Sequence, residues 1–140
     1  MLLNTSFNDK VKMIENNTLQ QEKDKIIDYK LHFQNLLISI STKYINADLT
    51  NVTALIEDSL EQIGRFVSAD RSYVFSYDLE NKECSNTFEW CKEGIEPEID
   101  NLQNVPINFI QQWLDVHKKG EAFYVEDVSL LPKDTLVKVK

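Results

Sequence analysis

The stretch "RSYVFSYDLENKECSNTFEWC", residues 71–91, contains two segments in which similar side chains recur at every second residue. This period of two is typical of a β-strand. One side of its first segment carries three aromatic residues, Tyr73, Phe75 and Tyr77. Strict alternation in the second segment predicts that one face carries Cys84, Asn86, Phe88 and Trp90. The polar letters "LENK" between the two segments suit a turn. The stretch therefore predicts an antiparallel hairpin.

A helix is predicted just before this hairpin. Between residues 46 and 70 the apolar residues keep to one helical face: Val52, Leu55, Ile56, Leu60, Ile63, Phe66 and Val67. Asp48, Thr50 or Asn51 can serve as the N-cap, and Gly64 weakens the helix only modestly. We expect this apolar face to point toward the core.

Further toward the N-terminus, the segment from Leu19 to Ile45 contains neither Gly nor Pro. Its apolar residues form an imperfect heptad seam, made of Leu19, Ile26, Phe33, Leu36 and Ile40. This pattern favours a helix that forms a parallel homodimer. A helix that packs on its own domain remains an alternative, because neighbouring apolar residues widen the stripe. Residues 1–18 are polar and rich in Asn, so we expect them to be frayed or weakly helical.

After the hairpin, an acidic connection with two prolines leads to a short predicted helix at 107–120. Its apolar stripe consists of Phe109, Ile110, Trp113 and Leu114, and Gly120 marks its end. Residues 121–128, "EAFYVEDV", predict a third strand, and "SLLPKD" at 129–134 opens a possible further helix. Together these elements predict an α+β fold, an antiparallel sheet with flanking helices, preceded by a long N-terminal helix.

Composition excludes several classes of function. A net charge of −8 and a pI near 4.7 disfavour nucleic acid as a partner, since phosphate binding requires clustered Lys and Arg. No window is long and apolar enough to span a membrane, and the first residues lack the pattern of a signal peptide. We therefore expect a cytoplasmic chain with no membrane contact. Cys84 and Cys91 are too few for a disulfide scaffold, so reduced thiols are expected.

No catalytic, cofactor or metal constellation is evident in the sequence. His32 and His117 have no Cys or His neighbour at metal-ligand spacing, and three glycines are too few for a phosphate-binding loop. An acidic run could supply oxygen ligands to calcium but lacks the EF-hand pattern; it consists of Glu93, Glu96, Glu98 and Asp100. We expect a protein that is not an enzyme and holds no metal or cofactor.

Three segments in order resemble a known family: "ADRSYVFSYD" (69–78), "SNTFEWCKEGIEPEIDNLQNVP" (85–106) and "KGEAFYVEDVSLLP" (119–132). They are similar to the first three strand regions of GAF domains, sensory modules of bacterial histidine kinases and diguanylate cyclases. The resemblance implies a GAF/PAS-like sheet, with a signalling helix at 1–45 and the first two thirds of a GAF domain at 46–140. The domain is expected to be incomplete at its C-terminus. Phe88 stands where the family often has His.

The resemblance also implies a function. Ligands of GAF domains lie between the sheet and the helix that covers it, so the candidate pocket residues are Phe88, Trp90, Phe109 and Trp113. A core filled by these aromatics is the alternative. A bilin chromophore is not expected, because Cys91 precedes Lys92 rather than His.

The resulting hypothesis is a non-catalytic sensory module that forms a homodimer and binds an unknown small ligand. One alternative is a constitutive dimerisation module without a ligand. Another is an enzyme that reduces oxidised methionine with Cys84 or Cys91.

Overall fold

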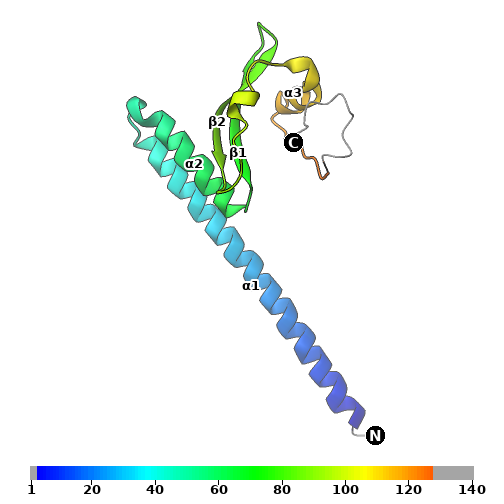
Figure 1. Ribbon diagram of the computed structural model, residues 1–140. Helices are drawn as coiled ribbons and strands as arrows, with labels where there is room; N and C mark the ends of the chain where they lie inside the picture. Colours follow the sequence, from blue (N-terminus) through cyan, green and yellow to red (C-terminus); the bar gives the residue numbers. More distant parts are fainter. Residues whose placement is uncertain (1–2, 128–140) are drawn as a thin grey trace. The chain divides into compact units, whose positions relative to one another are not determined.

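The computed structural model describes residues 3–127, and within residues 10–127 every side chain except that of Leu49. The chain divides into two compact units, one of residues up to Leu55 and one of residues from Ile56 onward. Helices and a three-stranded antiparallel sheet make up the described part (Figure 1). The expected α+β class, with a long N-terminal helix, is confirmed.

The N-terminal helix α1 spans Leu3–Ile45, which is 43 residues (Figure 1). Residues 3–18, for which the sequence predicted a frayed or weakly helical segment, are helical and continuous with the rest of α1. That segment contains neither Gly nor Pro, and a helix once formed extends at low cost per residue. Its polar side chains bond within the helix: the Thr18 hydroxyl donates to the Ile14 carbonyl at 3.0 Å.

The second helix, α2, spans Val52–Phe66 and follows a short 3₁₀ turn, η1, at Leu49–Asn51. Asp48 caps this turn, because its side chain accepts a hydrogen bond from the Thr50 amide at 3.3 Å. The residues of α2 that are buried are Ser59, Leu60 and Gly64. Leu60 and Gly64 belong to the unit that contains the sheet, where the Leu60 carbonyl accepts a hydrogen bond from the Ser72 hydroxyl at 2.7 Å.

The sheet has the order β1-β2-β3, with β1 at Arg71–Asp78, β2 at Glu83–Cys91 and β3 at Val105–Pro106. Both neighbouring pairs are antiparallel, which confirms the predicted hairpin. Its turn begins at Asp78, whose side chain accepts hydrogen bonds from the amides of Glu80 and Asn81.

A β-bulge at Thr87 interrupts the alternation along β2. Val74 pairs with Phe88 but Phe75 pairs with Asn86, which leaves Thr87 as the extra residue. Paired residues share a face, so Cys84 and Asn86 lie on the same face as Glu89 and Cys91. Phe88 and Trp90 lie on the opposite face. The predicted common face of Cys84, Asn86, Phe88 and Trp90 was therefore wrong.

The third strand is not where the sequence pattern placed it. Residues 121–127 contain no strand, and residues 128–134, which include the possible further helix, lie outside the described part. The third strand is the short β3, in which Pro106 pairs with Glu83. Proline is tolerated here because β3 lies at the edge of the sheet, where its missing N–H breaks no ladder between two strands.

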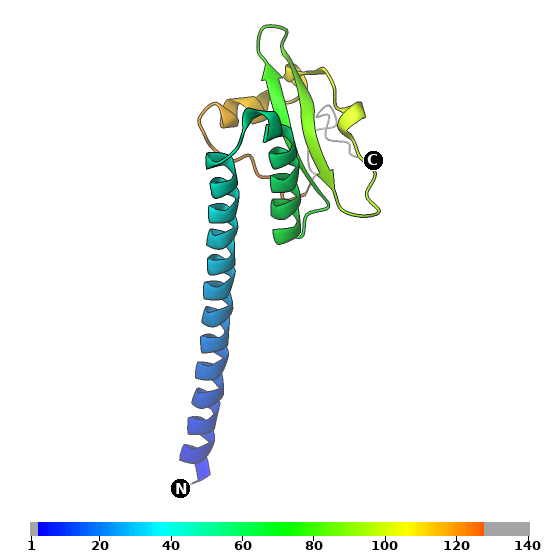
Figure 2. The same cartoon turned by 90° about the vertical axis from the view of Figure 1, so that its left-hand side faces the viewer.

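The short predicted helix is present as a 3₁₀ turn, η3, at Ile107–Phe109 followed by α3 at Gln111–His117. Gly120 has a φ of 74°, as expected for the residue that ends a helix. Three apolar side chains of this segment are buried, Ile107, Ile110 and Leu114. Figure 1 shows α2 and α3 on opposite sides of the hairpin, and Figure 2 shows the same hairpin with α2 in front of it.

Candidate functional site

A cavity of about 640 Å³ lies on the face of the sheet that is opposite α2. The aromatic side chains of β1 line one wall of it, and the connection from Asn101 to Pro106 lines another. The remaining lining residues are Cys84, Ile110, Trp113, His117, Phe123 and Val125. The second segment of the resemblance, residues 85–106, thus supplies part of the cavity wall.

Aromatic rings are prominent among the residues that line the cavity. Tyr73 and Phe75 meet edge to face with ring centroids 5.3 Å apart. Trp113 and Phe123 lie 5.9 Å apart and tilted. Such pairs stabilise each other beyond the burial of their area, so these walls hold their shape.

The polar side chains that line the cavity include Tyr77, His117, Asn101, Gln103 and Asn104. No Asp, Glu, Lys or Arg is among its described lining residues. The Tyr77 hydroxyl and His117 Nδ1 are 2.9 Å apart. Burial, with a smaller effect of Cys84, raises the pKa of the Tyr77 phenol, which keeps it neutral. The indole N–H of Trp113 is buried and has no partner within the described part of the chain. The cavity therefore offers a mainly apolar surface, rich in aromatic rings, with several hydrogen-bonding side chains.

Of the four candidate pocket residues, only Trp113 lines the cavity. Phe88 and Trp90 point to the other face of the sheet, where Trp90 packs on Gly64. Phe109 is 37% exposed and is not part of the lining. The structure thus does not bring the four together. The sequence signal that would have found the cavity is the aromatic side of β1, Tyr73, Phe75 and Tyr77.

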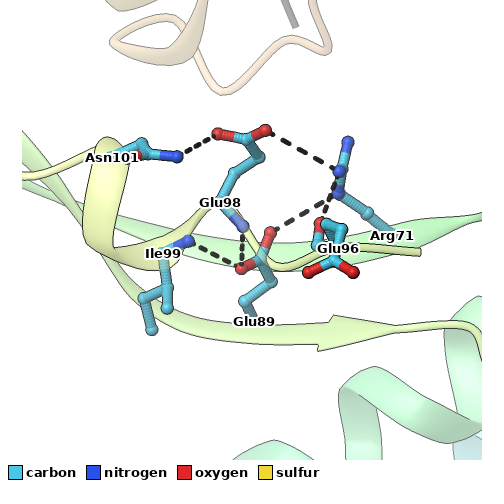
Figure 3. Close-up of polar contacts among 6 residues, drawn as sticks. All are labelled: Arg71, Glu89, Glu96, Glu98, Ile99 and Asn101. Carbon is cyan, nitrogen blue, oxygen red and sulfur yellow. Dashed lines mark hydrogen bonds and ion pairs between the residues drawn. The ribbon is translucent and has the colours of Figure 1, made fainter. Parts of the chain in front are cut away.

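A buried ion-pair network supports the cavity wall (Figure 3). The Glu89 side chain is only 2% exposed. Its Oε2 accepts hydrogen bonds from the amides of Glu98 and Ile99 at 2.9 and 2.8 Å. Arg71 lies beside it, with Nε 3.8 Å from Glu89 Oε1 and Nη2 3.9 Å from Glu98 Oε1. Arg71 also donates to the carbonyl of Glu96, so the network fastens residues 96–99 to the hairpin.

The rest of the connection is held by hydrogen bonds to β2. The Asn86 amide donates to the Leu102 carbonyl at 2.9 Å, and Gln103 Nε2 donates to the Asn86 carbonyl at 2.8 Å. The Asn104 amide donates to the Ser85 hydroxyl at 2.9 Å. Residues 102–104, which line the cavity, are therefore fixed by strand β2.

The acidic run is not arranged for a metal. Glu98 is engaged with Arg71 and with the side chain of Asn101. Within residues 3–127 no group of three or more His, Cys, Asp or Glu side chains has a geometry that could hold a metal ion. The same part of the chain contains no helix that combines the length and the apolar character needed to cross a bilayer.

Both cysteines are free thiols. They lie on one face of β2 but near its opposite ends, and Cys84 is buried. Burial raises the pKa of the Cys84 thiol. Burial first, and then the carboxylate of Glu89, raises the pKa of Cys91. Raised pKa values lower the fraction of thiolate, which is the reactive form.

Alkylation by iodoacetamide tests this description of the thiols. At about pH 7.5 both cysteines of the folded chain are expected to react at least about tenfold more slowly than in urea, with Cys84 the slower of the two. Peptide mass spectrometry after timed quenching gives the two rates separately. Equal rates in the folded and unfolded chain would contradict the burial and the raised pKa values.

Comparison of the chain with protein-family models, with curated proteins and with solved structures finds no match.

Proposed function

We propose that this chain is a non-catalytic sensory module of the GAF type from a bacterial signal-transduction protein, such as a histidine kinase or a diguanylate cyclase. A small, uncharged and largely aromatic molecule binds in the cavity between the sheet and α3. A homodimer formed through α1 transmits the bound state to an output domain. The observation that carries this proposal is the cavity, whose described lining is rich in aromatic rings and contains no Asp, Glu, Lys or Arg.

The size and lining of the cavity support a ligand. Protein sites for small molecules commonly have volumes of roughly 300–1,000 Å³, apolar walls and a few polar groups that orient the ligand. The cavity has this size, and Tyr77, His117 and Trp113 are among its polar groups, together with three amide side chains in residues 101–104. A charged ligand would lose its hydration without gaining an ionic partner among the described lining residues, which favours an uncharged one.

The attachment of the cavity wall to the hairpin supports a sensory role. A ligand changes a conformational equilibrium only through a difference in its affinity for the two states. Residues 101–105 line the cavity, while residues 96–99, a few positions earlier, are fastened to Arg71 and Glu89. A ligand that displaces residues 101–105 therefore acts on the same connection that the ion pair holds at residues 96–99. We propose that this connection packs differently with and without ligand, and that this difference is the switch.

The uncharged aromatic dye Nile red tests the cavity directly. Val105 lines the cavity, whereas Val74 points to the opposite face, so the two residues offer the same substitution on the two sides of the sheet. Val105→Trp fills the cavity and is expected to weaken Nile red binding about tenfold or more, while Val74→Trp leaves the affinity within about twofold. Fluorescence titration gives both dissociation constants, and circular dichroism checks that both variants fold.

Two outcomes would overturn the ligand part of the proposal. One is a wild-type chain that binds no Nile red and carries no extra mass in native mass spectrometry. The other is an equal effect of the two Val→Trp substitutions. A bare dimer in the mass spectrum would then favour a constitutive dimerisation module.

The thiols give little support to the enzyme alternative. Reduction of an oxidised methionine needs a reactive thiol, whereas burial raises the pKa of both Cys84 and Cys91. A double Cys84→Ser, Cys91→Ser variant that binds Nile red like the wild type would agree with the sensory proposal.

A further inference from the structure

Helix α1 carries a second apolar stripe, separate from the heptad seam of Leu19, Ile26, Phe33, Leu36 and Ile40. It consists of Ile27, Leu31, Ile38 and Ile45, with spacings of four, seven and seven. At about 100° per residue, this stripe lies roughly 140° around the helix axis from the heptad seam. We call it the second stripe.

The second stripe is the more exposed of the two. Its side chains are 55%, 53%, 63% and 81% exposed, in chain order. In the heptad seam, by contrast, Leu36 and Ile40 are half-buried. A row of exposed Ile and Leu side chains that extends over roughly 27 Å of helix is unfavourable in water and is typical of a surface that another helix covers.

The charged residues beside the second stripe determine the orientation in which a second helix can pack on it. With Leu31, Ile38 and Ile45 at heptad position a, Lys23 is at g and Asp28 at e. In a parallel, in-register pair of helices, g of one helix meets e five residues further along the other. Lys23 then meets Asp28 of a second copy, and the symmetric pair forms as well. An antiparallel pair would instead place g beside g, and the g residues Lys23 and Lys30 would repel each other.

The heptad seam lacks this complementarity. With Ile26 at position a, Lys25 is at g and Lys30 at e, so a parallel dimer brings two lysines together on each side. Glu22 occupies a d position and would face its own copy. Charge therefore favours the second stripe over the seam that the heptad pattern alone suggests.

We propose that a second copy of this chain docks on the second stripe, in parallel and in register, with Lys23 and Asp28 paired across the interface. This inference rests on the dimer part of the proposed function and names the face that forms it. Gln34 at a d position can pair with its own copy inside the contact. Asp24, at the preceding a position, would face its own copy, so the apolar contact begins at Ile27.

Charge reversal in the full chain tests the pairing. Lys23→Glu and Asp28→Lys are each expected to raise the dimer dissociation constant about tenfold, because each reverses two ion pairs. The double variant is expected to return to within about threefold of the wild type. Residues 23 and 28 are five apart and do not face each other within one helix, so rescue reports contact between helices. Sedimentation equilibrium gives the constants, and circular dichroism controls for the loss of the Asp28–His32 pair, which spans 3.4 Å.

Two matched substitutions test the face. Ile38 is on the second stripe and Ile26 is on the heptad seam, and both are more than half exposed. Ile38→Asp is expected to weaken the dimer about 100-fold or more, while Ile26→Asp changes the constant less than about threefold. In a Cys84→Ser, Cys91→Ser background, Ile38→Cys is expected to form a disulfide-linked dimer under mild oxidation.

The outcomes separate this inference from the proposal on which it rests. A wild-type chain that is monomeric at all concentrations overturns both the second stripe and the dimer part of the proposed function. A dimer that Ile26→Asp dissociates and Ile38→Asp leaves intact overturns the second stripe alone. Single charge reversals without effect, or a double variant without rescue, overturn the parallel pairing. Nile red binding in the cavity is measured independently of all these results.

Discussion

Replacing Arg71 with alanine is expected to lower the free energy of unfolding by about 3 kcal/mol. The reason is the environment of Glu89, whose side chain is 2% exposed and whose Oε1 has Arg71 as its cationic neighbour. Without the guanidinium, the buried Glu89 side chain loses its cationic neighbour and keeps the two amides that donate to its other oxygen. Urea unfolding followed by circular dichroism measures the change.

Arg65 provides a matched control for this substitution. Its Nε is 2.8 Å from Glu61 Oε1, a shorter distance than in either ion pair of Arg71, but the two side chains are 70% and 44% exposed. Exposed pairs contribute little, so Arg65→Ala is expected to cost less than about 1 kcal/mol. Adding Glu89→Gln to Arg71→Ala removes the unpaired charge and is expected to restore part of the lost stability. Equal costs for Arg65→Ala and Arg71→Ala would contradict the role given to burial.

Gly64→Ala is expected to lower the free energy of unfolding by about 2 kcal/mol, through overpacking. A Cβ at this position would lie 2.4 Å from Cζ3 of Trp90 and 3.2 Å from the Ser72 hydroxyl oxygen. The indole is rigid, so the helix or the strand has to move. In a helix free of contacts the same substitution would stabilise by about 1 kcal/mol, because Ala is the better helix former. The sign of the change therefore reports the contact between α2 and β2.

A double-mutant cycle makes this test specific. Trp90→Phe removes the ring atoms nearest to Gly64, so Gly64→Ala is expected to cost less in that background than in the wild type. Thermal or urea unfolding of the four proteins gives the coupling energy. Independent, additive effects of the two substitutions would show that Trp90 is not what requires glycine at position 64.

The parts of the fold that sequence predicts well are those in which local pattern and tertiary contact agree. The apolar face between 52 and 67 became α2, and Gly120 ends the segment of α3, because these patterns stay within one element. The hairpin followed from alternation around a polar turn. For residues 3–18 the Asn-rich composition left a frayed segment and a weak helix both open, and the absence of any helix breaker agrees with the helix.

The candidate site was harder to predict because it depends on one backbone irregularity. Alternation put Cys84 and Asn86 with Phe88 and Trp90, and only the pairing with β1 reveals the extra residue at Thr87. The side of the sheet that each aromatic faces follows from that pairing, so Trp90 was grouped with Trp113 although the two lie on opposite faces. The short β3 was missed because two residues, one of them proline, carry no period.

The bulge at Thr87 also determines how this hairpin can change by insertion and deletion. Deletion of Thr87 would give β2 one continuous alternation of side chains. The side chains of one half of the strand would then move to the opposite face of the sheet. Either Trp90 would leave Gly64, or Cys84 would leave the cavity. A homologous chain that lacks this residue would need different side chains along one half of β2 to keep both faces packed. In an alignment of related chains, residues 83–86 and 88–91 are therefore best treated as two separate blocks. At position 87 the side of the sheet that odd-numbered residues face changes.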